Sequence, residues 1–244
     1  MKRNKTAFDL IAFDADDTLW DTESLYRGIE ARFKTMMASY GIASVDPTMH
    51  DNEIRNLQYY GYGLKGFILS LIETAIELTG GRLGGNDVSQ MLAWAKEMQT
   101  APIRLREHAQ TTVAALSASY PLLLITKGDL LDQEAKLTRS GLSPYFRDIE
   151  VVSEKTQHTY AAILARHRVE PSRFLMVGNS LKSDILPVVT LGGHAVYIPA
   201  HLLWEHEAVS PPTEGREQQY VEMEHLGLLV PWIASLTEGD RDHA

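Results

Sequence analysis

The sequence predicts an α/β fold in which a doubly wound, mostly parallel, Rossmann-like sheet carries an inserted α-helical cap. Short apolar runs alternate with helical patterns in the second half of the chain, as in parallel sheets whose strands are joined by helices. A long helical stretch separates the first apolar run from the later ones, and polar side chains directly follow several runs. The 244 residues suffice for one domain with a large insertion or for two modest domains.

The first predicted strand covers residues 8–13 and is followed by Asp14-x-Asp16-x-Thr18. Asp is unfavourable in strands, and like charges two residues apart repel each other unless they share a cation or a proton. Open α/β sheets bind ligands at the carboxyl ends of their strands. Two carboxylates at such a position suit Mg²⁺, which prefers oxygen ligands. This segment therefore indicates a functional site.

Helical spacing extends from residue 20 to about residue 119. The clearest helix ends at Gly80 and has one apolar face, made of Leu64, Phe67, Ile68, Leu71, Ile72, Ala75 and Ile76. Similar spacing predicts an earlier helix over residues 25–40 and a later one over residues 88–95. We expect these helices to bury one another as a bundle that forms the cap.

Four later apolar runs predict strands over residues 122–125, 149–152, 174–177 and 195–198, separated by helical stretches near residues 130–140, 156–168 and 183–191. We therefore expect residues 1–19 and 107–205 to form the core and residues 20–106 to form the cap. From His201 onward, nine acidic side chains are accompanied by two arginines. Residues 206–244 are thus expected to be an acidic, solvated segment that packs on or trails the core.

The charge balance argues against a nucleic-acid-binding protein. Lys and Arg total 23 against 32 Asp and Glu, a formal net charge of −9, so a broad basic surface is not expected. The absence of cysteine excludes disulfides, thiolate metal sites and cysteine nucleophiles. No run approaches the roughly 18 apolar residues of a membrane span. We therefore expect a soluble, cytoplasmic protein without a nucleic-acid or membrane partner.

A second polar motif follows the strand predicted at residues 122–125. Thr126 comes directly after this run and is followed by Lys127 and Gly128. Its hydroxyl, the N–H groups of the loop and a glycine that permits close approach are suited to hold phosphate oxygens. Taken alone, a threonine after a strand is more often a helix cap.

The third and fourth motifs follow two further predicted strands. Lys155 comes after one of them, and Asn179 and Asp184 come after the other. A lone lysine is more often a solvated surface charge, and Gly-Asn-Ser is more often a turn. All four motifs lie at strand ends, however, and combine carboxylates, a cation, a hydroxyl and an amide. Together they indicate phosphate chemistry, in which cations and oriented donors must offset the charge of the attacking carboxylate.

Through these four motifs, from Asp14 to Asp184, the chain resembles the haloacid dehalogenase (HAD) superfamily of phosphohydrolases over residues 8–200. The resemblance implies a helical cap inserted between the first and second motifs. It implies that Asp14 is the nucleophile, which forms an aspartyl-phosphate. Asp16 would be the general acid for the leaving group and then the general base for water.

The same resemblance implies a Mg²⁺ cofactor and a phosphate site. It implies that Asp14, the backbone carbonyl of Asp16 and Asp184 hold the metal, and that Thr126 and Lys155 bind phosphate, with Lys155 also pairing with Asp14. The residues themselves add Asn179 to the candidate metal ligands and Lys127 and Gly128 to the candidate phosphate ligands. Asn179 stands where the family commonly has Asp, so we expect Mg²⁺ binding to be retained but weaker. Acid–base catalysis requires a pKa of Asp16 near neutrality, which neighbouring Asp14 favours and a metal ion opposes.

Substrate contacts beyond the phosphate are expected from the cap, because a closing lid excludes water and contacts the leaving group. Residues 59–66 combine three tyrosines, three glycines and a lysine, which suits either a lid segment or a helix–helix connection. The candidate specificity residues are Arg27, Arg55, Tyr60 and Lys65. We expect Lys65→Ala to raise KM for the natural substrate more than for a small generic ester.

The expected function is hydrolysis of a small phosphorylated metabolite with Mg²⁺. A phosphomutase stays open, because phosphoryl transfer to a second hydroxyl would leave the four motifs unchanged. A dehalogenase is disfavoured because a halide leaving group needs no acid at Asp16, and a phosphonatase because no cap lysine stands out. A catalytically weak phosphate-binding or regulatory protein is the alternative from another class, and Asn179 gives it some support. Neither the natural substrate nor the oligomeric state is predicted.

Overall fold

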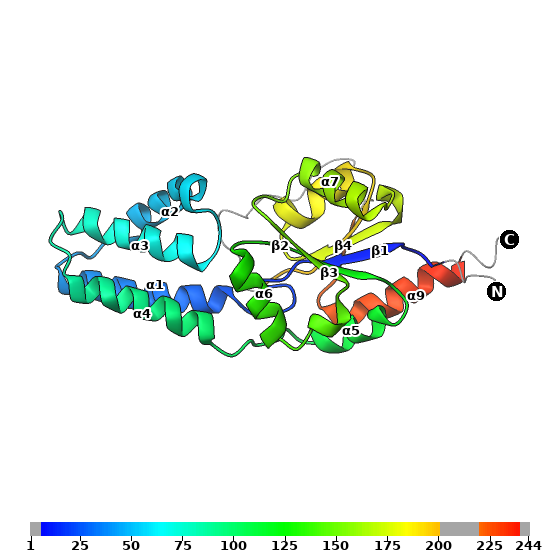
Figure 1. Ribbon diagram of the computed structural model, residues 1–244, viewed down its shortest axis with the longest axis horizontal. Coiled ribbons are helices and arrows are strands. Elements are labelled where there is room, and N and C mark those ends of the chain that lie inside the picture. The colour runs from blue at the N-terminus through cyan, green and yellow to red at the C-terminus, as the bar shows by residue number, and fades with distance from the viewer. Residues whose placement is uncertain (1–5, 201–219, 240–244) are drawn as a thin grey trace.

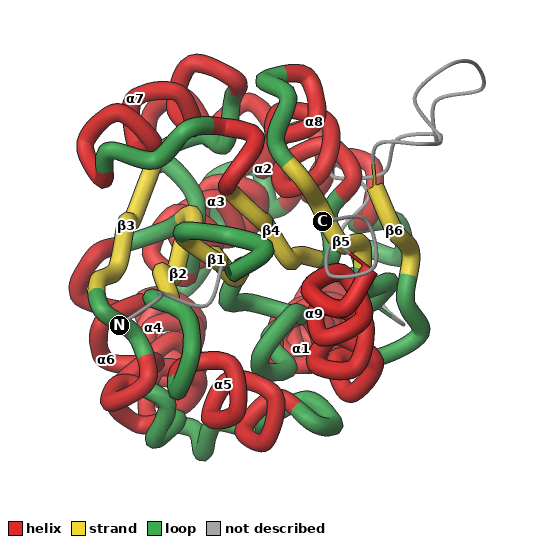
Figure 2. The backbone as a smooth tube through the Cα atoms, turned by 90° about the vertical axis from the view of Figure 1, so that its right-hand side faces the viewer, coloured by secondary structure: helices red, strands yellow, loops and turns green. Residues whose placement is uncertain are grey.

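The computed structural model describes residues 6–200 and 220–239, in which six parallel strands form one sheet (Figures 1 and 2). The strands are β1 (Leu10–Phe13), β2 (Leu122–Lys127), β3 (Asp148–Val152), β4 (Phe174–Gly178), β5 (His194–Tyr197) and β6 (Tyr220–Glu222). Their order is β3-β2-β1-β4-β5-β6, and the register pairs Phe13 of β1 with Leu124 on one side and Val177 on the other. The predicted doubly wound parallel sheet is confirmed.

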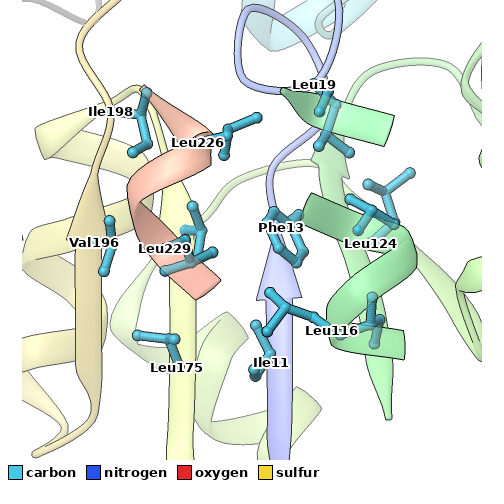
Figure 3. Close-up of a cluster of buried hydrophobic side chains, with 14 of the residues drawn as sticks. Ile11, Phe13, Leu19, Leu116, Leu124, Leu175, Val196, Ile198, Leu226 and Leu229 are labelled. Atoms are coloured by element: carbon cyan, nitrogen blue, oxygen red, sulfur yellow. The ribbon is translucent and has the colours of Figure 1, made fainter. Parts of the chain in front are cut away.

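Helices cover both faces of this sheet, because alternate side chains of a strand point to opposite sides. The helices of the core are α5 (Ala109–Ser117), α6 (Leu130–Arg139), α7 (Gln157–His167), α8 (Leu186–Thr190) and α9 (Leu229–Gly239). Ile11 and Phe13 of β1 belong to a buried cluster that includes side chains of α5, α6 and α9 (Figure 3). Leu10 and Ala12 belong to a second cluster with α7 and α8 on the opposite face.

The cap follows the carboxyl end of β1 and extends away from the sheet (Figure 1). Its helices are α1 (Glu23–Ser39), α2 (Asp46–Tyr60), α3 (Leu64–Leu78) and α4 (Gly85–Thr100). They enclose an apolar cluster of their own, which includes Phe33, Leu71 and Met91. Helices α1, α3 and α4 coincide with the three helices expected from apolar spacing. The cap thus has a core separate from that of the sheet.

Of the acidic segment expected to pack on or trail the core, residues 220–239 pack on it, and only their expected solvation is not found. These residues form β6, which pairs with β5, and α9, which packs on the sheet. Met223, Leu226, Leu229 and Ile233 are buried there, so apolar side chains between the acidic ones anchor this segment to the core (Figure 3). Residues 206–219 and 240–244 of the expected segment lie outside the described residues.

Parallel strands bring the polar residues that follow them to one edge of the sheet. Asp14, Thr126 and Asn179 lie at or just beyond the ends of β1, β2 and β4, which are neighbours in the sheet. The cap is attached at the same edge, so it stands over these residues. In the part of the chain that the structure describes, no helix combines the length and apolar character needed to cross a membrane.

Candidate active site

Asp14 is the central residue of the site and is almost completely buried. Its backbone N–H donates to the carbonyl of Val177 at 2.9 Å, which fixes it at the end of β1 beside β4. Its Oδ1 atom accepts a hydrogen bond from Lys155 Nζ at 2.5 Å. Its Oδ2 atom accepts one from Thr18 Oγ1 at 2.9 Å. Thr18, the last residue of the first motif, therefore orients the carboxylate of the first.

Lys155 joins the first motif to the fourth. Its ammonium group lies 2.7 Å from Asp184 Oδ1 as well as 2.5 Å from Asp14 Oδ1. The other oxygen of Asp184 accepts the N–H of Ser180 at 3.0 Å. A side chain at Gly178 would overlap the Asp184 carboxylate, so the glycine of this motif makes room for it. Sequence positions up to 170 residues apart thus form one buried charge cluster.

Burial and neighbouring charges act on this cluster in opposite directions. Burial raises the pKa of Asp14, and Asp184 raises it further, so that together they outweigh the opposing effect of Lys155. Burial alone would lower the pKa of Lys155, but the carboxylates of Asp14 and Asp184 raise it well above its usual value. Lys155 therefore stays charged, and two carboxylates share one cation. A second cation at this place would relieve their repulsion.

Asp16 is held by four donors around its carboxylate. They are Trp20 Nε1 at 2.8 Å, Thr22 Oγ1 at 2.7 Å, Gln133 Nε2 at 2.7 Å and Lys136 Nζ at 3.0 Å. Burial would raise the pKa of Asp16, but the charge of Lys136 and the hydrogen bonds from Gln133, Thr22 and Lys136 lower it overall. The pKa near neutrality expected for this residue is therefore not found in this arrangement.

Gln133 and Lys136 were not identified from the sequence. They lie on α6, where Asp132, Gln133 and Lys136 are buried while Leu130 and Leu131 are exposed. This is the reverse of the usual helix pattern, in which apolar side chains face the core. Polar residues at i and i+3 on the inner face, with leucines outside, are the signal that identifies them.

The second motif lies beside Asp14. Thr126 is buried, and Lys127 Nζ lies 3.1 Å from Ser183 Oγ and 4.1 Å from the centre of the Tyr62 ring. Gly128 has a φ of 125°, in the region that favours glycine. This turn joins β2 to α6.

A cavity of about 170 Å³ lies between the core and the cap. Seven of the residues predicted for the site line it: Asp14, Asp16, Thr126, Lys127, Lys155, Asn179 and Asp184. Gly128 is outside the lining. The cap contributes acidic, aromatic and glycine residues, among them Glu23, Glu30, Glu53 and Tyr26, which were not identified from the sequence.

The four candidate specificity residues of the cap lie elsewhere. Arg27, Arg55, Tyr60 and Lys65 are outside the lining of this cavity. Arg27 pairs with Glu23 on its own helix, and Arg55 and Tyr60 bond to Asn52 and Glu73, which belong to α2 and α3. A direct substrate contact therefore remains a prediction for these residues, without support from their positions.

Lys65 instead connects the cap to the core. Its ammonium group lies 2.9 Å from Asp129 Oδ2, and Asp129 also caps α6 by accepting the N–H of Asp132 at 3.1 Å. Near it, the hydroxyl of Tyr62 donates to Glu154 of the core. The segment between α2 and α3 is therefore both a helix–helix connection and a point of cap–core contact, and Tyr62 also lines the cavity.

The oxygen atoms around Asp14 suit Mg²⁺. Among the described residues, no group of three His, Cys, Asp or Glu side chains forms a metal cluster. The Asn179 amide faces Asp14 Oδ2 and the backbone oxygen of Asp16, and its nitrogen donates to them at 3.2 and 3.3 Å when it is turned toward them. Turning the amide by half a rotation offers its oxygen instead. Two carboxylates, an amide and a carbonyl then provide the oxygen ligands that Mg²⁺ prefers.

The chain is similar in sequence to known hydrolases. The model of the haloacid dehalogenase-like hydrolases matches residues 8–188. The pyrimidine 5'-nucleotidase YjjG of Escherichia coli is 26% identical over 226 residues, which cover 84% of this chain and 92% of the nucleotidase.

Two solved structures share the fold. A haloacid dehalogenase-like family hydrolase from Xanthomonas campestris is 36% identical, with a TM-score of 0.85 over 98% of this chain and 97% of that one. The putative HAD-hydrolase YfnB from Bacillus subtilis, solved with bound magnesium, is 17% identical, with a TM-score of 0.66 over 94% of this chain and 100% of that one.

Proposed function

This chain belongs to the haloacid dehalogenase-like hydrolases, and we propose that it hydrolyses a small phosphate monoester with Mg²⁺ through an aspartyl-phosphate on Asp14. The observation that carries the proposal is the position of Asp16, an acid–base group two residues after Asp14 that lines the same cavity. The nucleotidase relative is a phosphate monoester hydrolase by name, which supports the same reaction class.

In the first step, an Asp14 oxygen bonds to phosphorus while the bond from phosphorus to the ester oxygen breaks. Asp16 gives a proton to the departing oxygen. In the second step, water attacks phosphorus, Asp16 takes its proton, and the Asp14 carboxylate is released together with phosphate. Lys155 stands beside Asp14 and offsets the negative charge that accumulates there.

The environment of Asp16 suits both roles. Four donors hold it ionised in this arrangement, which is the state needed to accept a proton from water. A phosphate dianion in the cavity adds negative charge next to it and raises its pKa, which favours the protonated state needed in the first step.

Asp14, Asp184, Asn179 and the backbone oxygen of Asp16 would hold Mg²⁺. The ion would supply positive charge to the phosphate oxygens and lower the repulsion between the phosphate and Asp14. Thr126 and Lys127, which line the same cavity, would bind the remaining phosphate oxygens.

The residues favour phosphate chemistry over dehalogenation. A halide leaves without a proton, so dehalogenation does not require a general acid at Asp16. Here the Asp16 carboxylate is held by four hydrogen-bond donors. The two reactions also differ in the atom that water attacks. Water attacks phosphorus in an aspartyl-phosphate and the carboxyl carbon in an ester formed by dehalogenation.

The test is turnover of p-nitrophenyl phosphate with added Mg²⁺ or with EDTA. We expect activity that depends on the metal and that falls at least about a thousandfold in Asp14→Asn. Asp148→Asn, which changes an exposed core aspartate, is the matched control and should retain activity. In heavy-oxygen water the label should appear in phosphate, whereas label in Asp14 would show that water attacks the carboxyl carbon and not phosphorus. No metal-dependent turnover of this ester or of a panel of metabolites would refute the proposal.

A further inference from the structure

Among the described residues, lysines line the cavity only on its core side, whereas carboxylates line it on both sides. The core wall contains Lys127 and Lys155 together with Asp14, Asp16, Asp17 and Asp184. The cap wall contains three carboxylates, Glu23, Glu30 and Glu53, and no lysine or arginine among the described residues that line it. A substrate bound with its phosphate against the core therefore extends its leaving group toward negative charge.

Arg27 neutralises part of this charge from outside the cavity. Its guanidinium lies 2.9 Å from Glu23 and 3.6 Å from Glu30, and the side chain is 46% exposed. One guanidinium is shared by two carboxylates, and Glu53 adds a third from α2. Burial raises the pKa of Glu23 to about 7. Glu30, which has the longer contact with Arg27, and Glu53 on the second helix are the other two carboxylates of the wall.

Charges of both the catalytic centre and the cap wall act on Tyr26. Burial, followed by the charges of Asp16, Asp132, Glu53 and Glu23, raises the pKa of Tyr26 well above its usual value. The Tyr26 hydroxyl therefore stays protonated. Tyr26 lines the cavity together with Asp16, Glu23 and Glu53.

Aromatic rings line the same wall. Tyr26 and Phe67 meet edge to face with their ring centres 4.9 Å apart, and both line the cavity with Tyr62. The Tyr62 ring already carries the Lys127 ammonium group 4.1 Å from its centre. Carboxylates combined with aromatic faces are the surroundings that bind ammonium groups.

We propose that the cap wall selects phosphate monoesters whose leaving group ends in an ammonium group or another hydrogen-bond donor, and that it rejects leaving groups that end in a carboxylate. Glu30 and Glu53 are the residues that discriminate. This inference rests on the proposed phosphohydrolase activity. The cavity of about 170 Å³ also limits size, since cavities of about 150 Å³ hold a benzene molecule. Short amino-alcohol phosphates satisfy both conditions.

The test uses three phosphate esters whose two-carbon leaving groups differ only in the terminal group: phosphoethanolamine, 2-hydroxyethyl phosphate and phosphoglycolate. We expect kcat/KM to decrease in this order, with the ammonium ester at least about tenfold better than the carboxylate ester, because like charges in a partly buried site repel strongly. Each ester is assayed with Mg²⁺ beside p-nitrophenyl phosphate. Equal values for the three, or a preference for phosphoglycolate, would overturn the inference.

Glu30→Gln and Glu53→Gln, which keep the shape of the side chain, test the assigned residues. Each should lower the ratio of kcat/KM between the ammonium and carboxylate esters by about tenfold, since a hydrogen bond to a charged group is lost. Glu97→Gln removes an exposed cap carboxylate, paired with Arg32 and outside the cavity lining, and should keep the wild-type ratio. A wild-type ratio in both test variants would overturn the assignment. Absence of turnover with p-nitrophenyl phosphate would instead refute the proposed function and the inference with it.

Discussion

The ammonium group of Lys136 lies 3.0 Å from Oδ1 and 3.3 Å from Oδ2 of Asp16, so a lysine on α6 holds the proposed acid–base group of the site. Lys136 is itself buried and pairs with Asp132 one turn earlier on the helix. Burial would lower the pKa of Lys136, but the two carboxylates raise it, so the lysine stays charged. The position of α6 against β1 therefore influences the chemistry of Asp16.

Replacing Lys136 by methionine should alter the pH profile. Removal of the charge raises the pKa of Asp16, because Lys136 is the strongest of the influences that lower it. The first step needs protonated Asp16, so kcat/KM falls as the pH rises through this pKa. In Lys136→Met this fall should begin at a higher pH, and kcat should decrease at least about tenfold because the carboxylate loses an orienting partner.

Lys136→Arg retains the charge and serves as the control. It should keep the alkaline limb of kcat/KM close to that of the wild type, even if kcat decreases. A limb that moves equally in the arginine and methionine variants would mean that Lys136 acts through packing and not through its charge.

Asn179→Asp should strengthen metal binding. The change adds a carboxylate beside Asp14 Oδ2 and the backbone oxygen of Asp16, where the amide now lies. A third negative charge attracts Mg²⁺ more strongly, but without metal it adds repulsion to a buried cluster that contains one lysine. We expect a lower Mg²⁺ concentration for half-maximal activity, and a melting temperature that drops in EDTA and recovers with Mg²⁺. An unchanged Mg²⁺ requirement would exclude Asn179 from the metal site.

Sequence patterns predicted the sheet because its strands are continuous apolar runs, as expected when both faces are covered. They also placed Asp14, Lys155 and Asp184 near one another, since parallel strands end at the same edge. The structure brings the two carboxylates within hydrogen-bonding distance of the Lys155 ammonium group. Their catalytic roles remain proposals that the experiments above test.

Elements with polar inner faces could not be predicted from apolar spacing. Helix α2 buries Asn52 and Asn56, whose amides donate to Thr74 and Ser70 of α3 at 3.0 and 3.2 Å. The buried polar face of α6 was not predicted from the sequence for the same reason. Such faces are stable only because partners from other segments satisfy them, and the sequence of the helix alone does not reveal those partners.

Lys65→Ala should affect all substrates alike. Lys65 lies outside the cavity lining and pairs with Asp129 of the core, so its position indicates a contribution to cap closure. This differs from the larger effect on the natural substrate expected from the sequence. An exposed ion pair contributes about 0–1 kcal/mol, so we expect KM to rise by no more than about fivefold for each ester tested.

Asp129→Ala is the partner variant for this test, and the double variant completes the cycle. If the two residues act through their ion pair, the double variant should have nearly the KM of either single variant. A rise in KM confined to one substrate in Lys65→Ala would restore the specificity role predicted from the sequence.

Glu23→Gln should stabilise the protein in a pH-dependent way. Burial raises the pKa of Glu23 from 4.5 to about 7, so folding disfavours its ionised form. The free energy of unfolding therefore decreases as the pH rises from about 4.5 to about 7, and the loss is complete at higher pH. Allowing for solvent screening, we expect Glu23→Gln to increase the free energy of unfolding by about 1–2 kcal/mol at pH 8 and by much less at pH 5. At pH 8 this corresponds to a rise of about 2–6 °C in melting temperature. Thermal unfolding at both pH values, with Glu97→Gln as the exposed control, measures this difference. An equal change at pH 5 and pH 8 would mean that the ionisation of Glu23 does not oppose folding, and that the ion pair with Arg27 compensates its burial.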